Sequence, residues 1–288
     1  MYNLELKKLT IISLLLFSYI FNYGQSFQKE IEKLNDLGNQ IITSDNDIDK
    51  REANTKYVTE LKNLINLANT FDANFDSLKT ISILKEHHLK IYNWALPLTD
   101  GSFEYFAFLQ IKTDKGYSVI ELIDKSNEIK SPENRTLTPK SWYGALYYKL
   151  IHNKKIGEDT YTLLGWDGNN LLTNKKIIEA ITVSNNGMIK IGAPIFKMKN
   201  KTQRRIIFEY SENAVMSLKY HKDKEQIIFD FLVPSSSKLT GIPEYYGPAL
   251  NRFDALTMEK GKWVYEEDID IELNRNIKDH MWVDPKEK

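Results

Sequence analysis

Residues 214–233 read AVMSLKYHKDKEQIIFDFLV, and this stretch decides the fold class. Two runs rich in β-branched and aromatic residues flank the charged segment Lys222-Asp223-Lys224. Such runs form strands, and a short polar link between them favours antiparallel pairing. The stretch therefore predicts a β-hairpin with strands over residues 214–221 and 226–233.

The same pattern extends outward along most of the chain. Turn sequences such as Asp114-Lys115-Gly116 and Asn185-Asn186-Gly187 separate short apolar runs. Residues 125–140 and 234–258 are expected to be long loops. The short turns between the other runs predict a mainly antiparallel β-sheet that curls into a barrel or a sandwich, with a small propeller as a further alternative. The other strands are expected over residues 80–85, 88–96, 102–112, 117–124, 142–152, 160–166, 176–183, 188–191, 204–210 and 262–269.

The segment before the strands has a helical period instead. Apolar residues recur at intervals of three and four over residues 27–43 and again over residues 48–71. This spacing predicts two amphipathic helices, which we expect to form a hairpin within residues 25–76. An antiparallel β domain over residues 77–275 and a tail over residues 276–288 would follow, so the fold class is α+β.

Residues 1–24 have the pattern of a secretory signal peptide. Lys7 and Lys8 precede an apolar run over residues 9–21, and Gly24 suits the position before a cut. The run is shorter than the ~20 apolar residues that span a bilayer, although an uncleaved anchor is the alternative. No cysteine follows the cut, so a lipoprotein is not expected. We expect an exported protein, periplasmic or extracellular, without a transmembrane segment in its mature chain.

Composition and missing motifs limit the function classes. The chain has 39 Lys and Arg against 39 Asp and Glu, and this balance gives no reason to expect a nucleic acid partner. It has no cysteine, which excludes disulfides, thiolate nucleophiles and cysteine-ligated metals. Phosphate-loop, dinucleotide-binding, nucleophile-elbow and zinc-protease motifs are all missing from the sequence, so no cofactor is expected.

Asp230 is the first candidate for acid–base chemistry. Pairing Tyr220 with Ile227 places Asp230 opposite Ser217 and diagonal to Lys219. Both faces of its strand are largely apolar, and a half-buried acid can have a perturbed pKa and act in catalysis. The alternative is a structural role, either in an ion pair with Lys219 or in a hydrogen bond to the backbone.

The acidic strand near the C-terminus carries further candidate carboxylates. Alternation places Glu266, Asp268 and Asp270 on one face. Three carboxylates in a row can hold a hard cation, or they can protect an exposed sheet edge through their charge. Together with Asp230, they would supply the acids of a hydrolase.

An aromatic loop offers a binding site of another kind. Pro243-Glu244-Tyr245-Tyr246-Gly247-Pro248 is followed by Trp263 and Tyr265. Tyrosine and tryptophan on a loop can stack on sugar rings or on a peptide, and they can equally pin the loop onto the sheet. The candidate ligand-binding residues are therefore Tyr245, Tyr246, Trp263 and Tyr265.

The histidines do not predict a metal site. His87 and His88 are adjacent, and in a strand they would point to opposite faces. A three-histidine zinc site would require His152, His221 or His280 to converge on them. No metal is therefore expected.

The chain contains distinctive runs at Tyr161–Asn169, Ile227–Pro234, Tyr245–Pro248, Phe253–Leu256, Gly261–Trp263 and Glu267–Asp270. In these runs it resembles a group of exported proteins from Bacteroidota. The resemblance covers roughly residues 90–272 and implies export, a bacterial envelope setting and a single β-rich unit. That group has no assigned activity, so the resemblance implies no functional residue.

Taken together, these observations favour a non-enzymatic binding or structural module of the cell envelope. Its partner would be an envelope protein, a glycan or a small ligand, held by the aromatic loop over residues 243–248. The alternative is a hydrolase that acts on an envelope or secreted polymer through its carboxylates. Glycoside hydrolysis would require two carboxyl groups about 5–9.5 Å apart in one cleft.

Overall fold

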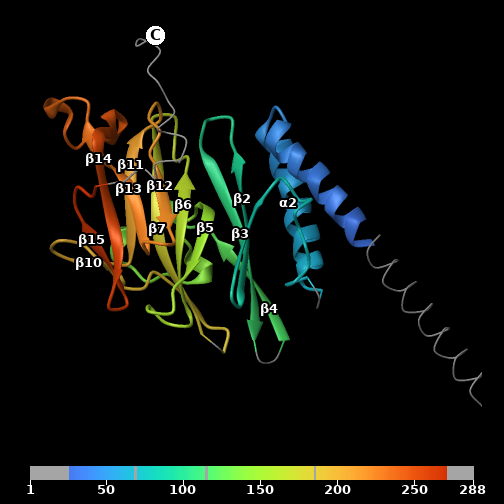
Figure 1. Cartoon of the computed structure of the whole chain (residues 1–288). Coiled ribbons are helices and arrows are strands. Elements are labelled where there is room, and N and C mark those ends of the chain that lie inside the picture. Colours follow the sequence, from blue (N-terminus) through green and yellow to red (C-terminus); the bar gives the residue numbers. More distant parts are fainter. Residues whose placement is uncertain (1–25, 68–69, 114–115, 185, 271–288) are drawn as a thin grey trace, which may run out of the picture.

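Two helices and three β-sheets follow one another from right to left across Figure 1. The computed structural model describes residues 26–67, 70–113, 116–184 and 186–270. The expected signal peptide (1–24) and tail (276–288) lie outside these residues. The α+β class is confirmed, with about 45% of the chain in strands. Among the described residues, no helix has the length and apolar character needed to cross a bilayer.

The two helices form the expected hairpin against the first sheet. The first covers residues 26–43, and α2 covers Asp47–Ile65. The side chain of Asn46 accepts a hydrogen bond from the backbone N–H of Asp49 at 2.9 Å, which caps the start of α2. The core under the helices contains Ile31, Leu34, Tyr57, Leu61, Tyr92, Trp94 and Phe108.

The second helix is shorter than expected, because it ends at Ile65 and not at Phe71. The ammonium group of Lys90 holds residues that come after the helix end. It donates to the backbone carbonyls of Thr70, Phe71 and Ala73, each at 3.2 Å. Lys90 is itself buried in the first sheet, and these carbonyls supply hydrogen-bond acceptors for its buried charge.

The strands are assigned to three sheets by their hydrogen bonds. The first sheet has the order β1-β2-β3-β4, the second β11-β7-β6-β5 with β8 beside β7, and the third β10-β9-β15-β14-β13-β12. Their bounds are β1 Ser82–Glu86, β2 Leu89–Pro97, β3 Phe103–Thr113, β4 Gly116–Ile123, β5 Leu146–His152, β6 Thr160–Asp167, β7 Thr173–Val183, β8 Ile189–Ile191, β9 Phe196–Lys197, β10 Thr202–Gln203, β11 Arg205–Ser211, β12 Leu218–His221, β13 Gln226–Pro234, β14 Tyr246–Glu259 and β15 Lys262–Glu266. Short 3-10 helices cover Ser126–Glu128, Pro132–Asn134, Pro139–Ser141, Ser237–Leu239 and Pro243–Tyr245.

Among the named strands of the described residues, pairing is antiparallel except that β15 runs parallel to β9. The hairpin over residues 214–233 has the expected register, with Tyr220 opposite Ile227. The sheets are not closed into a barrel, so that alternative is wrong. They stack instead, with one apolar core between the first and second sheets and another between the second and third.

One expected loop is a strand. Residues 234–258 include most of β14, which pairs with both β13 and β15. The alternation of apolar and polar residues that predicts a strand is interrupted in this segment by Gly247, Pro248 and Asn251. The register shifts between Asp230 and Leu232 of β13, and Asn251 has a φ of 56°, so the strand is irregular where these residues occur.

The second sheet is buried on both faces. Adjacent residues of β6 show this arrangement, because Leu163 belongs to the core shared with the first sheet and Leu164 to the core shared with the third. The same holds for Ile177 and Ile178 in β7. A sheet covered on both faces requires nearly continuous apolar runs, which explains the sequence of β6 and β7.

A charged pair lies inside this middle sheet. Glu179 of β7 and Arg205 of β11 are opposite one another, fully buried and ion-paired. Burial lowers the pKa of Arg205 to about 10, so its guanidinium remains charged at neutral pH. Glu179 also accepts a hydrogen bond from the hydroxyl of Tyr147, and Arg205 Nη1 donates to the carbonyl of Pro132 at 2.5 Å. The pair thus ties the segment over residues 125–140 to the middle sheet.

We predict that replacing Arg205 with methionine (R205M) lowers the free energy of unfolding by about 3–5 kcal/mol, because Glu179 is left as an uncompensated buried charge. The double variant R205M/E179M should recover part of this loss, since neither charge remains. Chemical denaturation at pH 7 measures both changes.

The control for this comparison is K56A, which breaks an exposed Lys56–Glu52 pair and should change stability little. An R205M protein as stable as the wild type would contradict the role assigned to the pair.

Candidate ligand-binding site

An open groove lies where the second and third sheets end. It has a volume of about 470 Å³. Its walls come from the end of β11 with the following turn, and from the connection between β13 and β14. The lining residues are Ser211, Asn213, Ala214, Val233, Pro234, Ser235, Glu244, Tyr245, Tyr246, Gly247 and Pro248.

Short-range hydrogen bonds hold the groove in shape. The N–H of Ser235 donates to the carbonyl of Tyr245 at 2.9 Å, which closes the connection at the ends of β13 and β14. The hydroxyl of Tyr246 accepts from the N–H of Gly241 at 3.0 Å, so this ring is pinned inside the loop. Pro243 starts the short helix that carries Tyr245 to the groove.

Exposed apolar side chains lie on segments that line the groove or adjoin it, although of these side chains only Tyr245 lines the groove itself, and Leu171 lies against Gly101. Leu172 precedes β7, and its carbonyl accepts from the N–H of Glu212 at 2.9 Å, so the β6–β7 and β11–β12 connections are neighbours. The exposed fractions are 70% for Leu171, 59% for Leu172, 88% for Val215, 40% for Ile242, 45% for Tyr245 and 96% for Leu250. We call these six residues the loop-end surface. Exposed apolar residues beside a groove are a feature of many interaction sites.

Polar side chains in the groove are free to bind a ligand. With the described residues, Asn213 Nδ2, the Ser235 hydroxyl and the Glu244 carboxylate make no hydrogen bond or ion pair. The groove therefore combines apolar area with hydrogen-bonding groups that have no internal partner, which is the composition of a recognition site.

The four aromatic residues expected to bind a ligand are not brought together. Tyr245 and Tyr246 line the groove, but only Tyr245 presents an exposed ring. Trp263 is fully buried in the core between the second and third sheets, where its Nε1–H donates to the Thr162 hydroxyl at 2.9 Å. Tyr265 donates from its hydroxyl to the buried carboxylate of Asp254, and burial raises the pKa of Tyr265. Trp263 and Tyr265 thus have structural roles within the third sheet and its core.

Asp230 also has a structural environment. It lies opposite Ser217 as expected, with only 8% of its surface exposed. Its Oδ2 accepts from the N–H of Ser217 at 2.7 Å, and its own N–H donates to the Ser217 carbonyl at 3.1 Å. No ion pair joins Asp230 to Lys219 within the described chain. The backbone hydrogen bond, one of the two structural alternatives, is the one observed.

The acidic strand ends earlier than expected. β15 stops at Glu266, and Asp268 has a φ of 48°, so strand alternation does not extend to Asp268 and Asp270. The N–H of Asp268 donates to Asp254 Oδ1 at 3.0 Å. The expectation of three carboxylates in a row along one strand face is therefore wrong.

Asp270 lines a different pocket, on the outer face of the third sheet. This pocket has a volume of about 520 Å³ and also contains Lys219 and His221. Among its described lining residues Asp270 is the single carboxylate, and no residue of the groove lines it. The pair of carboxyl groups needed for glycoside hydrolysis is not formed there.

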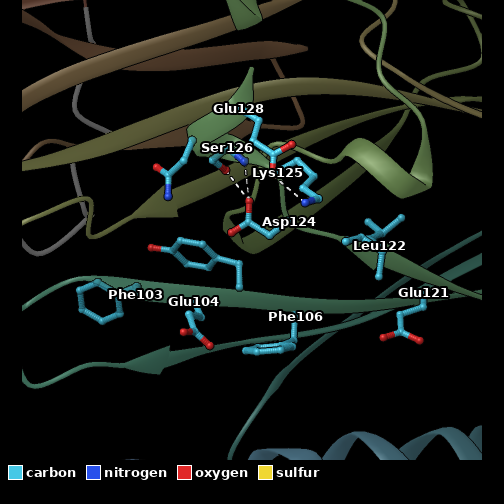
Figure 2. Close-up of a pocket in the computed structure, with 12 residues that line it drawn as sticks. Phe103, Glu104, Phe106, Glu121, Leu122, Asp124, Lys125, Ser126 and Glu128 are labelled. Carbon is cyan, nitrogen blue, oxygen red and sulfur yellow. Dashed lines mark hydrogen bonds and ion pairs between the residues drawn. The ribbon is translucent and has the colours of Figure 1, made fainter. Parts of the chain in front are cut away.

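A third pocket, shown in Figure 2, is richer in acids. It has a volume of about 350 Å³ between the ends of β3 and β4 and the segment that follows β4. Each of its carboxylates is already engaged. Glu104, Glu121 and Glu128 pair with Arg51, Lys62 and Lys125, and Asp124 accepts from Ser126 and Gly144. These acids stabilise local structure and offer no free acid–base pair.

The comparisons with known proteins do not add to this geometry. No protein-family model, no curated protein and no solved structure matches the chain.

Sequence reasoning found Tyr245 but missed most of the loop-end surface. Val215 falls within an expected strand and Leu250 within an expected loop, while Leu171 and Leu172 lie between two expected strands, so no shared pattern singles them out. A signal was present, since Asn169 and Asn170 mark a turn immediately before two leucines. Apolar residues inside a turn are those most easily left exposed.

We predict that Asp230 supports the hairpin and that its loss affects stability. Replacing it with alanine (D230A) should cost about 1–2 kcal/mol, because the half-buried N–H of Ser217 loses its acceptor. D230N should cost less, because the amide oxygen still accepts. Thermal or chemical unfolding measures the difference.

The control is D223A, at an exposed position in the turn of the same hairpin. Equal stability of D230A and D223A would show that the hydrogen bond to Ser217 has no structural weight.

Proposed function

We propose that this protein is a non-enzymatic binding module whose loop-end surface docks another protein. The observation that carries the proposal is the exposure of five aliphatic residues and Tyr245 on segments that line the groove or adjoin it. Each such residue exposes apolar surface to water in the free protein. Burial of that surface against a partner would stabilise the complex.

The chemistry of the surface favours a protein over a glycan. Leu171, Leu172, Val215 and Leu250 are aliphatic, and aliphatic side chains gain most from contact with other apolar side chains. Sugar recognition would favour several flat aromatic rings, and the surface has one, Tyr245. The free groups of Asn213, Ser235 and Glu244 would supply the polar contacts that fix the orientation of the partner.

The carboxylates support this choice over a hydrolase. In the three pockets described above, which are lined by described residues, Asp230, Asp268 and Asp270 do not come together with one another or with the tyrosines, and the acids of the Figure 2 pocket are paired internally. We further propose that the partner is an exported or envelope protein. This step rests on the signal-peptide pattern of residues 1–24 and on the resemblance described above.

We predict that the variant L172S/V215S/Y245S loses the partner. The full chain and the variant, immobilised at equal density, would be used to capture proteins from an envelope extract, with mass spectrometry as the readout. A partner retained by the wild type should fall at least tenfold with the variant, because such anchors account for most of the binding free energy.

The matched control replaces three equally exposed residues elsewhere, in I42S/I48S/M188S. Those side chains are exposed by 54%, 78% and 54%. The proposal predicts that this control retains the partner. Equal capture by the two triple variants, with both folded by circular dichroism, would contradict it.

A further inference from the structure

Three histidines and a glutamate meet at one corner of the molecule. His87 and His88 form the turn between β1 and β2, His152 is the last residue of β5, and Glu158 lies in the connection to β6. The expectation that His87 and His88 point apart assumed a strand. They occupy a turn instead, so strand alternation does not separate them, and His152 converges on them.

Three side chains of this corner lie close enough together to hold one metal ion. One ligand atom each from His87, His152 and Glu158 lie within 4.8 Å of one another. The imidazole rings of His87 and His152 are stacked, with centroids 4.9 Å apart and planes 5° from parallel. His88 lies alongside, with its Nδ1 2.8 Å from His87 Nδ1. Small rotations of exposed side chains would bring the three ligand atoms onto one ion.

Hydrogen bonds already select suitable tautomers. His152 Nε2 is 3.0 Å from the carbonyl oxygen of Glu158, which can only accept, so Nε2 carries the proton and Nδ1 keeps its lone pair. When His87 Nδ1–H donates to His88 Nδ1, His87 Nε2 keeps its lone pair in the same way. The Tyr161 hydroxyl is 3.1 Å from His88 Nδ1 and holds that ring from behind. Second contacts of this kind orient metal-binding histidines.

The backbone at His87 is a separate indication. Its φ is 50°, a left-handed conformation that glycine or asparagine adopts at lower cost. In this conformation the His87 ring stacks on the ring of His152. A left-handed residue other than glycine is a reason to look for a function at that position.

We propose that His87, His152 and Glu158 bind a divalent transition-metal ion, with Zn²⁺ as the chemical match. Two imidazole nitrogens and one carboxylate form a zinc ligand set that leaves the fourth tetrahedral position for water or for a group from another molecule. Lys154 Nζ lies 3.6 Å from the Glu158 carboxylate and would compete with the metal ion for it. Exposed ion pairs of this kind are weak. The site lies away from the loop-end surface, so the two proposals are independent.

The test is a zinc titration of the full chain after treatment with a chelator. Equilibrium dialysis should give one Zn²⁺ per chain, and binding should be at least about tenfold weaker in H152Q, E158Q and H87N. Cu²⁺, which favours the same ligands more strongly, serves as a spectroscopic probe. Its electron paramagnetic resonance spectrum should show hyperfine splitting from two imidazole nitrogens in the wild type and from one in H152Q.

H87N separates metal loss from misfolding, because asparagine suits the left-handed turn. Its melting temperature without metal should equal or exceed that of the wild type, while the rise that zinc causes in the wild type should disappear. H221Q removes a histidine outside the group and should bind as the wild type does. Unchanged zinc binding in H87N and H152Q, or an equal loss in H221Q, would overturn the site.

Discussion

The middle sheet must be buried on both of its faces, and the rest of the structure depends on that constraint. Leu163 and Leu164, adjacent in β6, belong to two different cores, so a sheet must cover each side. The first sheet covers one side and is itself covered by the helical hairpin, while the third sheet covers the other (Figure 1). The order of layers follows from this need to bury apolar area.

Such a scaffold leaves its connections free for function. β6 runs between two connections that lie at opposite ends of the sheet, one carrying Glu158 and the other carrying Leu171 and Leu172. The histidine group and the loop-end surface therefore occupy opposite ends of the same rigid layer. Loops on a rigid framework are common positions for binding residues, because the framework holds their ends in place.

Much of this fold could be predicted from the sequence, because local patterns specify local elements. The period-two runs located most strands, and the pairing of Tyr220 with Ile227 followed from a single turn. β14 was missed because Gly247, Pro248 and Asn251 interrupt its pattern. The stacking of sheets depends on contacts between distant segments, which no local pattern records.

The site was harder to predict for the same reason. Trp263 has the residue type of a ligand-binding side chain, but whether its strand turns it toward solvent or into a core depends on the neighbouring sheet. His152 is far along the chain from His87, and their convergence depends on the β1–β2 turn reaching the end of β5. Asp230 is a candidate acid in the sequence, and only the structure shows that its carboxylate accepts a hydrogen bond from the Ser217 backbone N–H.

Hydrogen–deuterium exchange of the full chain tests the central claim most directly. If the doubly buried middle sheet is the constraint on which the fold depends, the amides of β6 and β7 should exchange last, at a rate set by global unfolding. The amides of the third sheet should exchange earlier, because that sheet has one face without a covering sheet. Slowest exchange in β13 and β14, with β6 and β7 exchanging before them, would contradict the account.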